Sequence, residues 1–257
     1  MSRFWIVNIA FVVLLIALYL LDVQYGLSVV WYIVLIVALV ALHTAGSIIL
    51  SLQFFIPTRC KGESANAIAI TFDDGPIAGM TDKILAILKE HNVKASFFCI
   101  GHRVAREPML AKRLHEEGHL LGNHTYWHKA TFDLQSGNTI AKELADTDNA
   151  IVKAVGVKPK FFRPPYGVTN PMVASGIKRG GKYTVIGWSV RSFDTVIKDR
   201  AKLFQRVTRS LKGGDIVLFH DYSESTLDIL SDFLNHVSKL GLKVVRVDEL
   251  LNEKAYV

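Results

Sequence analysis

Two long uncharged apolar runs near the start of the chain restrict its fold more than any other feature. Phe4–Leu21 spans 18 residues without a charge, and Leu27–Leu42 spans another 16. About 20 apolar residues are enough to cross a bilayer, so each run is a candidate transmembrane helix. The linker Asp22–Gly26 is short enough to join the two runs as a helical hairpin. We therefore expect residues 1–57 to form an N-terminal transmembrane hairpin, and the protein to be an integral membrane protein of the bacterial inner-membrane type.

A cleavable signal peptide is the alternative for the first run. Arg3 supplies a weak positive charge ahead of it, as signal peptides require. The flank Tyr19–Asp22, however, contains no small-x-small cleavage pattern. The hairpin is therefore the favoured interpretation.

The rest of the chain, residues 58–257, has the mixed composition of a globular protein and is long enough for one sizeable domain. Residues 1–57 hold one Arg and one Asp, so the formal net charge of +7 belongs to this second part. Such a charge favours anionic headgroups or phosphate-bearing substrates, although a solvated surface would also account for it. No basic stripe interleaved with aromatic residues is present, so nucleic acid is not an expected partner.

Cys60 and Cys99 show no metal-binding spacing. One cysteine pair in so long a chain is weak evidence for a disulfide, and we expect free thiols.

Short apolar runs alternate with helical patterns throughout the second part. We expect strands at Ala67–Phe72, Ala95–Ile100, His119–Gly122, Phe161–Phe162, Tyr183–Trp188, Asp215–His220 and Lys243–Val247, and helices at Thr81–His91, Glu107–Glu117, Thr139–Val155, Asn170–Arg179, Asp199–Leu211 and Ser225–Leu240. This alternation indicates βαβ units and a parallel sheet. With six or seven such units, the expected fold is an α/β fold of the distorted (β/α)7-type barrel. In such a barrel the functional residues gather at the carboxyl ends of the strands.

Polar residues follow several of these strands. Asp73 and Asp74 end the first strand, where two adjacent carboxylates resist ionising together unless a cation joins them. His124 and His128 are spaced i, i+4, so they meet on one turn, and two histidines with one carboxylate leave a position open on zinc. Each pattern alone has a simpler explanation: Asp-Asp-Gly is common in solvated turns, and a His pair is often structural.

The remaining histidines lie within predicted helices or at their flanks, and we interpret them as structural: His43, His91, His102, His115, His119 and His236.

Four segments in order resemble the polysaccharide deacetylases, the NodB-homology enzymes of carbohydrate esterase family 4. These segments are Thr71–Pro76, His124–His128, Arg163–Gly167 and Leu218–His220, and the resemblance covers about residues 66–250. The resemblance implies a distorted (β/α) barrel that uses a divalent metal, usually zinc. It also implies hydrolysis of N-acetyl, or sometimes O-acetyl, groups on sugars.

Residue by residue, the resemblance implies that Asp74, His124 and His128 hold the metal. Asp73 would be the general base that deprotonates water made acidic by the metal. His220 would be the general acid that protonates the departing sugar amine.

The resemblance assigns supporting roles to four further residues. Arg163 would orient Asp73 and keep it ionised, and Asp194 would pair with His220, fix its tautomer and raise its pKa. The backbone N–H of Tyr166 would stabilise the oxyanion, and Leu218 would form a wall for the acetyl methyl group.

One family motif departs from its usual pattern. Where relatives carry Asp-x-x-Asp-Trp, this chain reads Arg191-Ser192-Phe193-Asp194-Thr195. The arginine suggests a substrate with a phosphate or carboxylate, and Phe193 or Trp188 could replace the missing aromatic wall.

The expected function is thus a membrane-anchored, metal-dependent deacetylase that hydrolyses N-acetyl groups of an amino-sugar polysaccharide or a lipid-linked sugar. The alternatives are a catalytically silent carbohydrate-binding or membrane-assembly protein, an O-acetyl esterase and a deformylase. Arg3, Arg59 and Lys61 flank the outer ends of the hairpin, which by the positive-inside rule places the domain in the cytoplasm. Most family members act outside, so the side of the membrane stays open, as does the oligomeric state.

Overall fold

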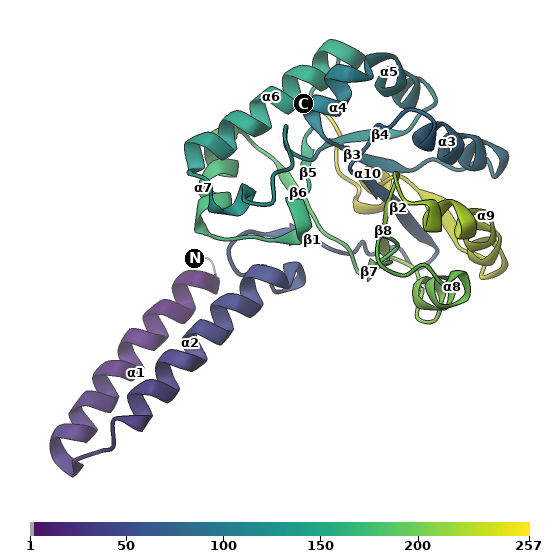
Figure 1. Cartoon of the computed structure of the whole chain (residues 1–257). Helices are drawn as coiled ribbons and strands as arrows, with labels where there is room; N and C mark the ends of the chain where they lie inside the picture. The colour runs from purple at the N-terminus through teal and green to yellow at the C-terminus, as the bar shows by residue number, and fades with distance from the viewer. Residues whose placement is uncertain (1–2) are drawn as a thin grey trace.

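A computed structural model describes residues 3–257 of the chain. Its N-terminal part is an antiparallel pair of helices, α1 (Arg3–Tyr25) and α2 (Val30–Ile48), which projects from the rest of the protein (Figure 1). Both helices are long and apolar enough to cross a membrane. Within these two helices Gly46 is the one buried residue, so their apolar side chains are left uncovered by the protein.

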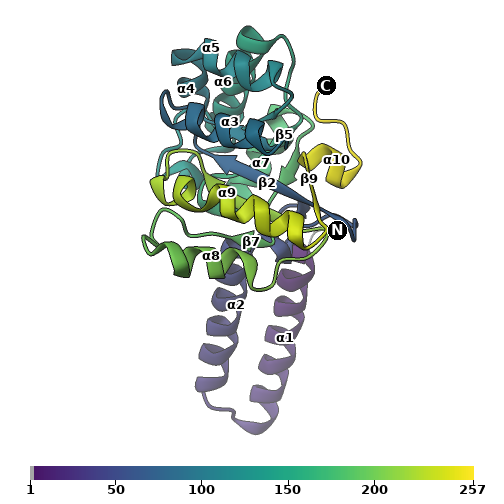
Figure 2. The same cartoon turned by 90° about the vertical axis from the view of Figure 1, so that its right-hand side faces the viewer.

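The hairpin meets the globular part through a short segment (Figure 2), and this segment packs against its surroundings. One residue, Ile49, separates α2 from the 3₁₀ turn η1 (Leu50–Leu52). Phe54 then packs on Gly46 so closely that any side chain at position 46 would overlap its ring. Ser47 Oγ donates to the carbonyl of Thr169 (2.7 Å), and the Thr169 N–H donates to the Ser47 carbonyl (3.0 Å).

In the described residues, nine strands form one curled sheet, and every pairing between them is parallel. The hydrogen-bonded order is β1-β6-β5-β4-β3-β2-β8-β7, with β9 added to the first half of β2. The strands are β1 (Thr58–Arg59), β2 (Ala67–Asp73), β3 (Ser96–Cys99), β4 (Leu120–Asn123), β5 (Phe161–Phe162), β6 (Thr184–Ile186), β7 (Val190–Arg191), β8 (Ile216–His220) and β9 (Lys243–Val245).

Helices cover the outer face of this sheet (Figure 1). They are α3 (Met80–Glu90), α4 (Gly101–Arg106), α5 (Pro108–Glu116), α6 (Gly137–Val155), α7 (Pro171–Gly180), α8 (Arg200–Thr208), α9 (Glu224–Lys239) and α10 (Val247–Leu251), with 3₁₀ turns η2 (Phe132–Leu134) and η3 (Pro165–Gly167). The predicted α/β class and barrel-like parallel sheet are confirmed.

Side-chain caps explain where several helices begin. Ser136, Asn170 and Asp199 each accept a hydrogen bond from the backbone N–H three residues later. Such caps satisfy a donor that the helix itself cannot pair. They occur one residue before α6, α7 and α8, close to the starts predicted from the sequence.

A cluster of buried aromatic rings supports the centre of the sheet. Phe72 of β2 stacks on Phe97 of β3 (centroids 5.0 Å apart) and on Phe219 of β8 (6.1 Å), and Phe219 meets Phe233 of α9 edge to face (5.4 Å). All four rings are at most 1% exposed. Phe72 directly precedes Asp73 and Phe219 directly precedes His220. The packing of these rings therefore holds the carboxyl ends of β2 and β8 in place.

Replacing Phe233 with alanine is expected to lower the free energy of unfolding by about 3–5 kcal/mol, because it leaves a cavity in this cluster. Denaturant unfolding of the detergent-solubilised chain measures the loss. The control is Met109→Ala on α5, where the side chain is 73% exposed and the change should stay within about 0.5 kcal/mol. Equal effects of the two substitutions would contradict the prediction.

Some predicted boundaries are wrong. The strand predicted at Lys243–Val247 ends at Val245, because the Val247 N–H donates to Ser96 Oγ and begins α10. The strand predicted at Tyr183–Trp188 ends at Ile186. There, side-chain N–H groups of Arg163 donate hydrogen bonds to the carbonyls of Ile186 and Gly187.

Two short strands and two short helices had no counterpart in the prediction, and one of these helices is α10. Strands β1 and β7 have two residues each, which is too short for a recognisable pattern, and helix α4 precedes the helix predicted at Glu107–Glu117. Cys60 and Cys99 are both free thiols, as expected.

Candidate active site

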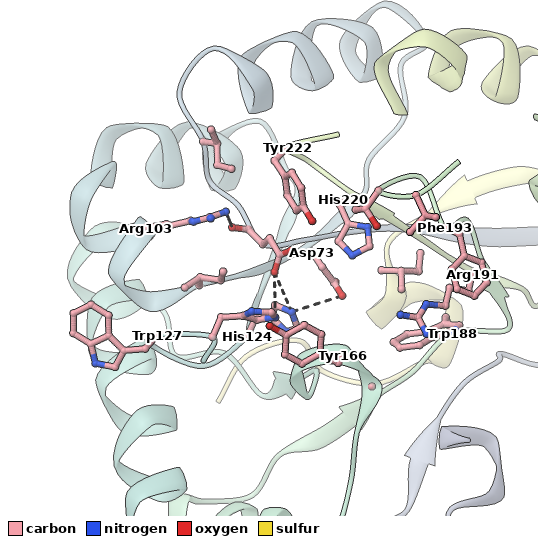
Figure 3. A pocket seen from close by; sticks show the side chains of 18 of the residues that line it. Asp73, Arg103, His124, Trp127, Tyr166, Trp188, Arg191, Phe193, His220 and Tyr222 are labelled. Atoms are coloured by element: carbon pink, nitrogen blue, oxygen red, sulfur yellow. Dashed lines mark hydrogen bonds and ion pairs between the residues drawn. The ribbon is translucent and has the colours of Figure 1, made fainter. Parts of the chain in front are cut away.

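A cleft of about 680 Å³ lies at the carboxyl ends of the strands (Figure 3). Seven of the predicted site residues line it: Asp73, Asp74, His124, His128, Tyr166, Leu218 and His220. The other two, Arg163 and Asp194, are fully buried behind it. The structure therefore brings all nine predicted residues to one place.

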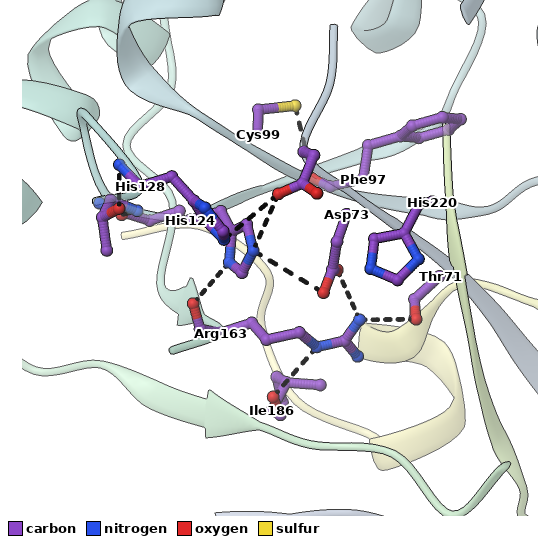
Figure 4. Close-up of polar contacts among 12 residues, drawn as sticks. Thr71, Asp73, Phe97, Cys99, His124, His128, Arg163, Ile186 and His220 are labelled. Atoms are coloured by element: carbon purple, nitrogen blue, oxygen red, sulfur yellow. Dashed lines mark hydrogen bonds and ion pairs between the residues drawn. The ribbon is translucent and has the colours of Figure 1, made fainter. Parts of the chain in front are cut away.

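Asp73, at the end of β2, is held by a buried arginine (Figure 4). Arg163 Nη1 donates to Asp73 Oδ1 (2.7 Å) and to Thr71 Oγ1 (2.8 Å). Its remaining donors reach backbone carbonyls of Ile186 (3.2 Å) and Gly187 (2.8 Å). With every nitrogen of the guanidinium engaged, Arg163 presents a fixed positive charge to one oxygen of Asp73, and the other oxygen is left toward the cleft.

Asp74, His124 and His128 form a compact cluster of metal-ligand atoms. Asp74 Oδ1 lies 3.4 Å from His124 Nε2 and 3.3 Å from His128 Nε2, and one ligand atom from each residue falls within 4.8 Å of the others. His124 Nδ1 donates to the carbonyl of Arg163 (2.7 Å), which fixes the tautomer and leaves Nε2 facing Asp74.

The donor set fits a divalent metal. Asp74 Oδ1 is buried and has no hydrogen-bond partner among residues 3–257, an arrangement that is costly unless a cation completes it. Two imidazoles and one carboxylate are ligands that suit zinc, and three protein ligands leave a coordination position for substrate or water.

Burial and charge oppose each other within the cluster and shift the pKa values of its three members in different directions. Burial opposes ionisation of Asp74, but the hydrogen bond and charge of His124 outweigh it and hold its pKa well below the usual range. Burial and the neighbouring His124 lower the pKa of His128 to about 4, so this imidazole is neutral at pH 7. For His124, burial lowers the pKa, but Asp73 and Asp74 outweigh burial and raise it.

The loops that carry these ligands adopt unusual backbone conformations. Asp74, Thr125 and His128 have positive φ values of 79°, 65° and 49°. Residues other than glycine rarely adopt this region, and when they do it is often at functional sites. Glu143 Oε2 holds the His-bearing loop by accepting from the N–H groups of residues 126 and 127 (3.1 and 3.0 Å).

On the other side of Asp73, His220 is paired with a buried carboxylate. His220 Nδ1 lies 2.8 Å from Asp194 Oδ1, and the His220 N–H donates to Asp194 Oδ2 (2.8 Å). Ser192 and Thr226 hydroxyls also donate to Asp194. Burial lowers the pKa of His220, but Asp194 outweighs burial and raises it. The imidazole can therefore carry a proton on Nε2, and its ring faces Asp73 (Figure 4).

Tyr166 and Leu218 lie on the walls of the cleft. Tyr166 has φ 58° and its ring packs on His128 (centroids 4.9 Å apart). Gly167, at φ 72°, allows Trp188 to pack directly against the backbone, where any side chain would clash with the indole. Leu218, on β8, is 2% exposed and supplies an apolar wall.

The residues that depart from the family motif also line the cleft. Arg191, Thr195 and both of the aromatic residues suggested as replacements, Trp188 and Phe193, face it. Two aromatic rings therefore line the cleft although Thr195 stands where relatives carry tryptophan.

Among the lining residues that were not predicted site residues, four are polar or aromatic side chains that sequence analysis did not connect with the site: His102, Arg103, Trp127 and Tyr222. Arg103 of α4 donates from Nη1 to the carbonyl of Asp74 (2.6 Å), and Tyr222 lies above His220 (Figure 3). Trp127 stacks on His102 with centroids 5.3 Å apart, so His102, interpreted as structural, lies in the cleft wall. Of these four residues, only Trp127 could have been placed near the site from the sequence, because it lies between His124 and His128.

Known proteins resemble this chain in sequence and in structure. The family model for polysaccharide deacetylase matches residues 61–185. Peptidoglycan-N-acetylmuramic acid deacetylase PdaA of Bacillus subtilis is 34% identical over 191 residues, which cover 73% of this chain and 72% of that protein. The chain belongs to the polysaccharide deacetylase family.

Other relatives differ in length and in activity. Peptidoglycan-N-acetylglucosamine deacetylase PgdA of Listeria monocytogenes is 36% identical over 77% of this chain, and the match spans 42% of the length of that protein. Among solved structures, the Bc1960 peptidoglycan N-acetylglucosamine deacetylase has a TM-score of 0.70 and 27% identity, covering 76% of this chain and 93% of its own. A CE4 family pseudoenzyme from Bacillus anthracis has a TM-score of 0.70 and 30% identity, covering 76% and 69% of the two chains.

Proposed function

We propose that this protein is a metal-dependent deacetylase that hydrolyses the N-acetyl group of an amino sugar in a polysaccharide or a lipid-linked sugar. The observation that carries the proposal is that three units converge on one cleft: the Asp73–Arg163 pair, the Asp74–His124–His128 cluster and the Asp194–His220 pair. Together they contain a base, a metal site and an acid, which is what cleavage of an unreactive amide requires. The named activities of the relatives point in the same direction.

We assign the metal to Asp74, His124 and His128, with zinc as the proposed ion. When bound there, it would polarise the acetamide carbonyl and make water acidic enough to lose a proton near neutral pH.

The proton transfers are assigned to the residues on either side. Asp73 takes the proton of the attacking water through the oxygen that Arg163 leaves free. His220 gives the proton on Nε2 to the departing amine, while Asp194 stabilises the imidazolium and fixes its orientation. Without this proton the amine would leave as an anion, which is unfavourable.

The remaining two residues position the acetyl group. The Tyr166 backbone N–H is assigned as a donor to the oxyanion that develops on the carbonyl, and its positive φ sets the direction of that N–H. Leu218 is assigned to contact the acetyl methyl, because it lies two residues before His220 on β8 and its apolar side chain also lines the cleft.

Release of acetate tests the proposal directly. The full chain in detergent, supplied with Zn²⁺, is incubated with N-acetylglucosamine oligomers, with peptidoglycan and with a lipid-linked N-acetylated sugar, and acetate is quantified. The same chain with Asp73→Asn measures the background. Absence of acetate above this background from all substrates would overturn the proposal. It would favour the silent carbohydrate-binding alternative, for which the pseudoenzyme of the same fold is a precedent.

The pH dependence should respond to Asp194. Asp194→Asn is expected to move the basic limb of the kcat/KM profile to lower pH. His220 acts in its protonated form, so activity falls as pH rises through its pKa; Asp194 raises that pKa, and removing its charge lowers it. We also expect kcat at pH 7 to fall about tenfold or more. A basic limb that stays in place or moves to higher pH would contradict this assignment.

We further propose that residues 1–57 anchor residues 58–257 to a membrane. The uncovered apolar surfaces of α1 and α2 support this. The expected result is that the full chain stays with membranes through alkaline carbonate extraction and keeps its N-terminal segment by mass spectrometry. Loss of that segment would indicate a cleaved signal peptide instead. A reporter fused after Val257 identifies the side on which the domain lies.

A further inference from the structure

A second hollow in the domain surface lies beside the joint with the hairpin. This groove has a volume of about 540 Å³ and is lined by the segment that follows η1, by β1, by β6 and by one face of α7. It shares no lining residue with the active-site cleft. Figure 1 shows α7 and β1 on the side of the domain next to the hairpin.

The start of α1 is tied to the segment that lines this groove. Arg3 Nη1 donates to the carbonyl of Leu52 (2.6 Å), and the Phe4 N–H donates to the carbonyl of Phe54 (3.0 Å). Gln53, between these two acceptors, lines the groove. The 23 residues of α1 span about 35 Å, which exceeds the hydrocarbon core of about 30 Å. With the hairpin in a bilayer, this end of the groove would therefore lie at the level of the lipid headgroups.

Apolar side chains form the buried part of the groove. Ile56, Ile177 and Val185 are buried, and the half-buried side chains of Phe55 and Ala174 pack against them. This lining gains free energy when another apolar group covers it.

Basic side chains form the exposed part of the groove. Arg59 and Lys178 both line it and are exposed. Among residues 3–257, no carboxylate lies within ion-pair distance of Lys178. Arg59 Nε lies 3.3 Å from Glu253 Oε1, but the second oxygen of that carboxylate also lies 3.7 Å from Lys160 Nζ. The lining therefore carries two cations against one shared carboxylate.

We propose that this groove binds one anionic phospholipid, with an acyl chain against the apolar part and the phosphate between Arg59 and Lys178. The inference rests on the proposed membrane anchor and adds a specific lipid site to it. A free phosphate would meet the cations and leave the apolar part uncovered. A zwitterionic lipid carries its own cation beside its phosphate. An anionic phospholipid matches both parts, and its headgroup lies at the level where the groove begins.

Native mass spectrometry of the full chain in a neutral detergent tests the proposal. Phosphatidylglycerol and phosphatidylcholine with identical acyl chains are added separately, and the lipids retained per chain are counted. We expect one retained phosphatidylglycerol, bound about tenfold or more tightly than phosphatidylcholine. The double variant Arg59→Gln/Lys178→Gln should lower the affinity for phosphatidylglycerol about tenfold or more and leave that for phosphatidylcholine unchanged, because each cation near a lipid surface adds to the attraction.

The matched control is Arg209→Gln/Lys239→Gln. It removes two exposed cations outside the groove, one just after α8 and one at the end of α9, and changes the net charge equally. The control should keep the preference for phosphatidylglycerol. Equal losses in the two double variants would show a general attraction and overturn the proposal, as would the absence of any preference in the unmodified chain.

Two further measurements distinguish a lipid from a phosphate ion. Ala174→Phe fills the apolar part and should lower the affinity for phosphatidylglycerol about tenfold, although both cations remain. Inorganic phosphate in excess should not displace the bound lipid. Displacement by phosphate, or full affinity after Ala174→Phe, would overturn the lipid assignment.

Alkaline carbonate extraction separates this inference from the proposed anchor. Both double variants should stay with the membrane, because α1 and α2 remain unchanged. Loss of the unmodified chain from the membrane would contradict the anchor. A chain that stays in the membrane but shows no preference for phosphatidylglycerol would contradict the groove alone.

Discussion

Asp73→Asn is expected to reduce kcat by about 10²–10⁴-fold while the protein still binds its metal. Asparagine has the same shape as aspartate and can still accept the hydrogen bond that Arg163 Nη1 donates to Asp73 Oδ1 at 2.7 Å. It cannot take a proton from water, and loss of a general base typically costs this much. Asp73 is not among the three clustered ligands, so stoichiometric metal should remain. Steady-state rates and elemental analysis of the same sample measure both quantities.

The same substitution should also lower stability, because it leaves the fully buried Arg163 charge without its counter-charge. We expect a loss of about 3 kcal/mol or more in the free energy of unfolding. Asp232→Asn serves as the control, since Asp232 is an exposed residue of α9 that pairs with Arg200 on the surface. It should retain activity and stability. An Asp73→Asn protein that keeps its metal and more than a tenth of the original kcat would exclude Asp73 as the base.

His124→Ala is expected to weaken metal binding strongly, and activity with it. It removes one of three ligands, and the lost imidazole is also the one whose Nδ1 is fixed by the Arg163 carbonyl. The remaining pair, Asp74 and His128, should bind Zn²⁺ at least about 10–100-fold more weakly, the loss already seen when only the outer support of a ligand is removed. Two readouts do not depend on catalysis: zinc content by elemental analysis, and the rise in melting temperature on adding Zn²⁺, which should disappear.

His102→Ala is the matched control for this experiment. Its imidazole lines the same cleft, stacks on Trp127 and bonds to the carbonyl of residue 126, but it lies outside the ligand cluster. Its zinc content should therefore equal that of the unmodified chain. Zinc retained after His124→Ala, or lost after His102→Ala, would show that the metal site is elsewhere.

The proximity of the central site residues could be predicted from the sequence because of the topology of the sheet. Asp73 and His220 are the last residues of β2 and β8, and His124 directly follows β4. The carboxyl ends of such parallel strands meet at one edge. Their distance along the chain is therefore irrelevant once the strands are recognised. Helix starts were also close, because Asn170 and Asp199 are residues that favour the cap position.

The side chains that form the walls of the cleft could not be predicted from the spacing of residues in the sequence. Arg103 reaches Asp74 because α4 starts directly after β3, and no hydrophobic pattern marks so short a helix. Trp188 enters the cleft because Gly167 has no side chain. The direction of His128 depends on its φ of 49°, a conformation that tertiary contacts impose against the local preference. Such features follow from packing between distant segments and cannot be predicted residue by residue.

The joint between the hairpin and the domain would set the working range of the protein if residues 1–57 anchor it to a membrane, as proposed. Two hydrogen bonds between Ser47 and Thr169, and the contact of Phe54 with Gly46, tie the domain directly to the hairpin. A domain of about 200 residues measures on the order of 40 Å across. With the hairpin in a bilayer, the cleft would be held at a constant height within that distance of the lipid. Glycan that matures farther away would be out of reach, so the time at which a strand passes the membrane surface would decide whether it is modified.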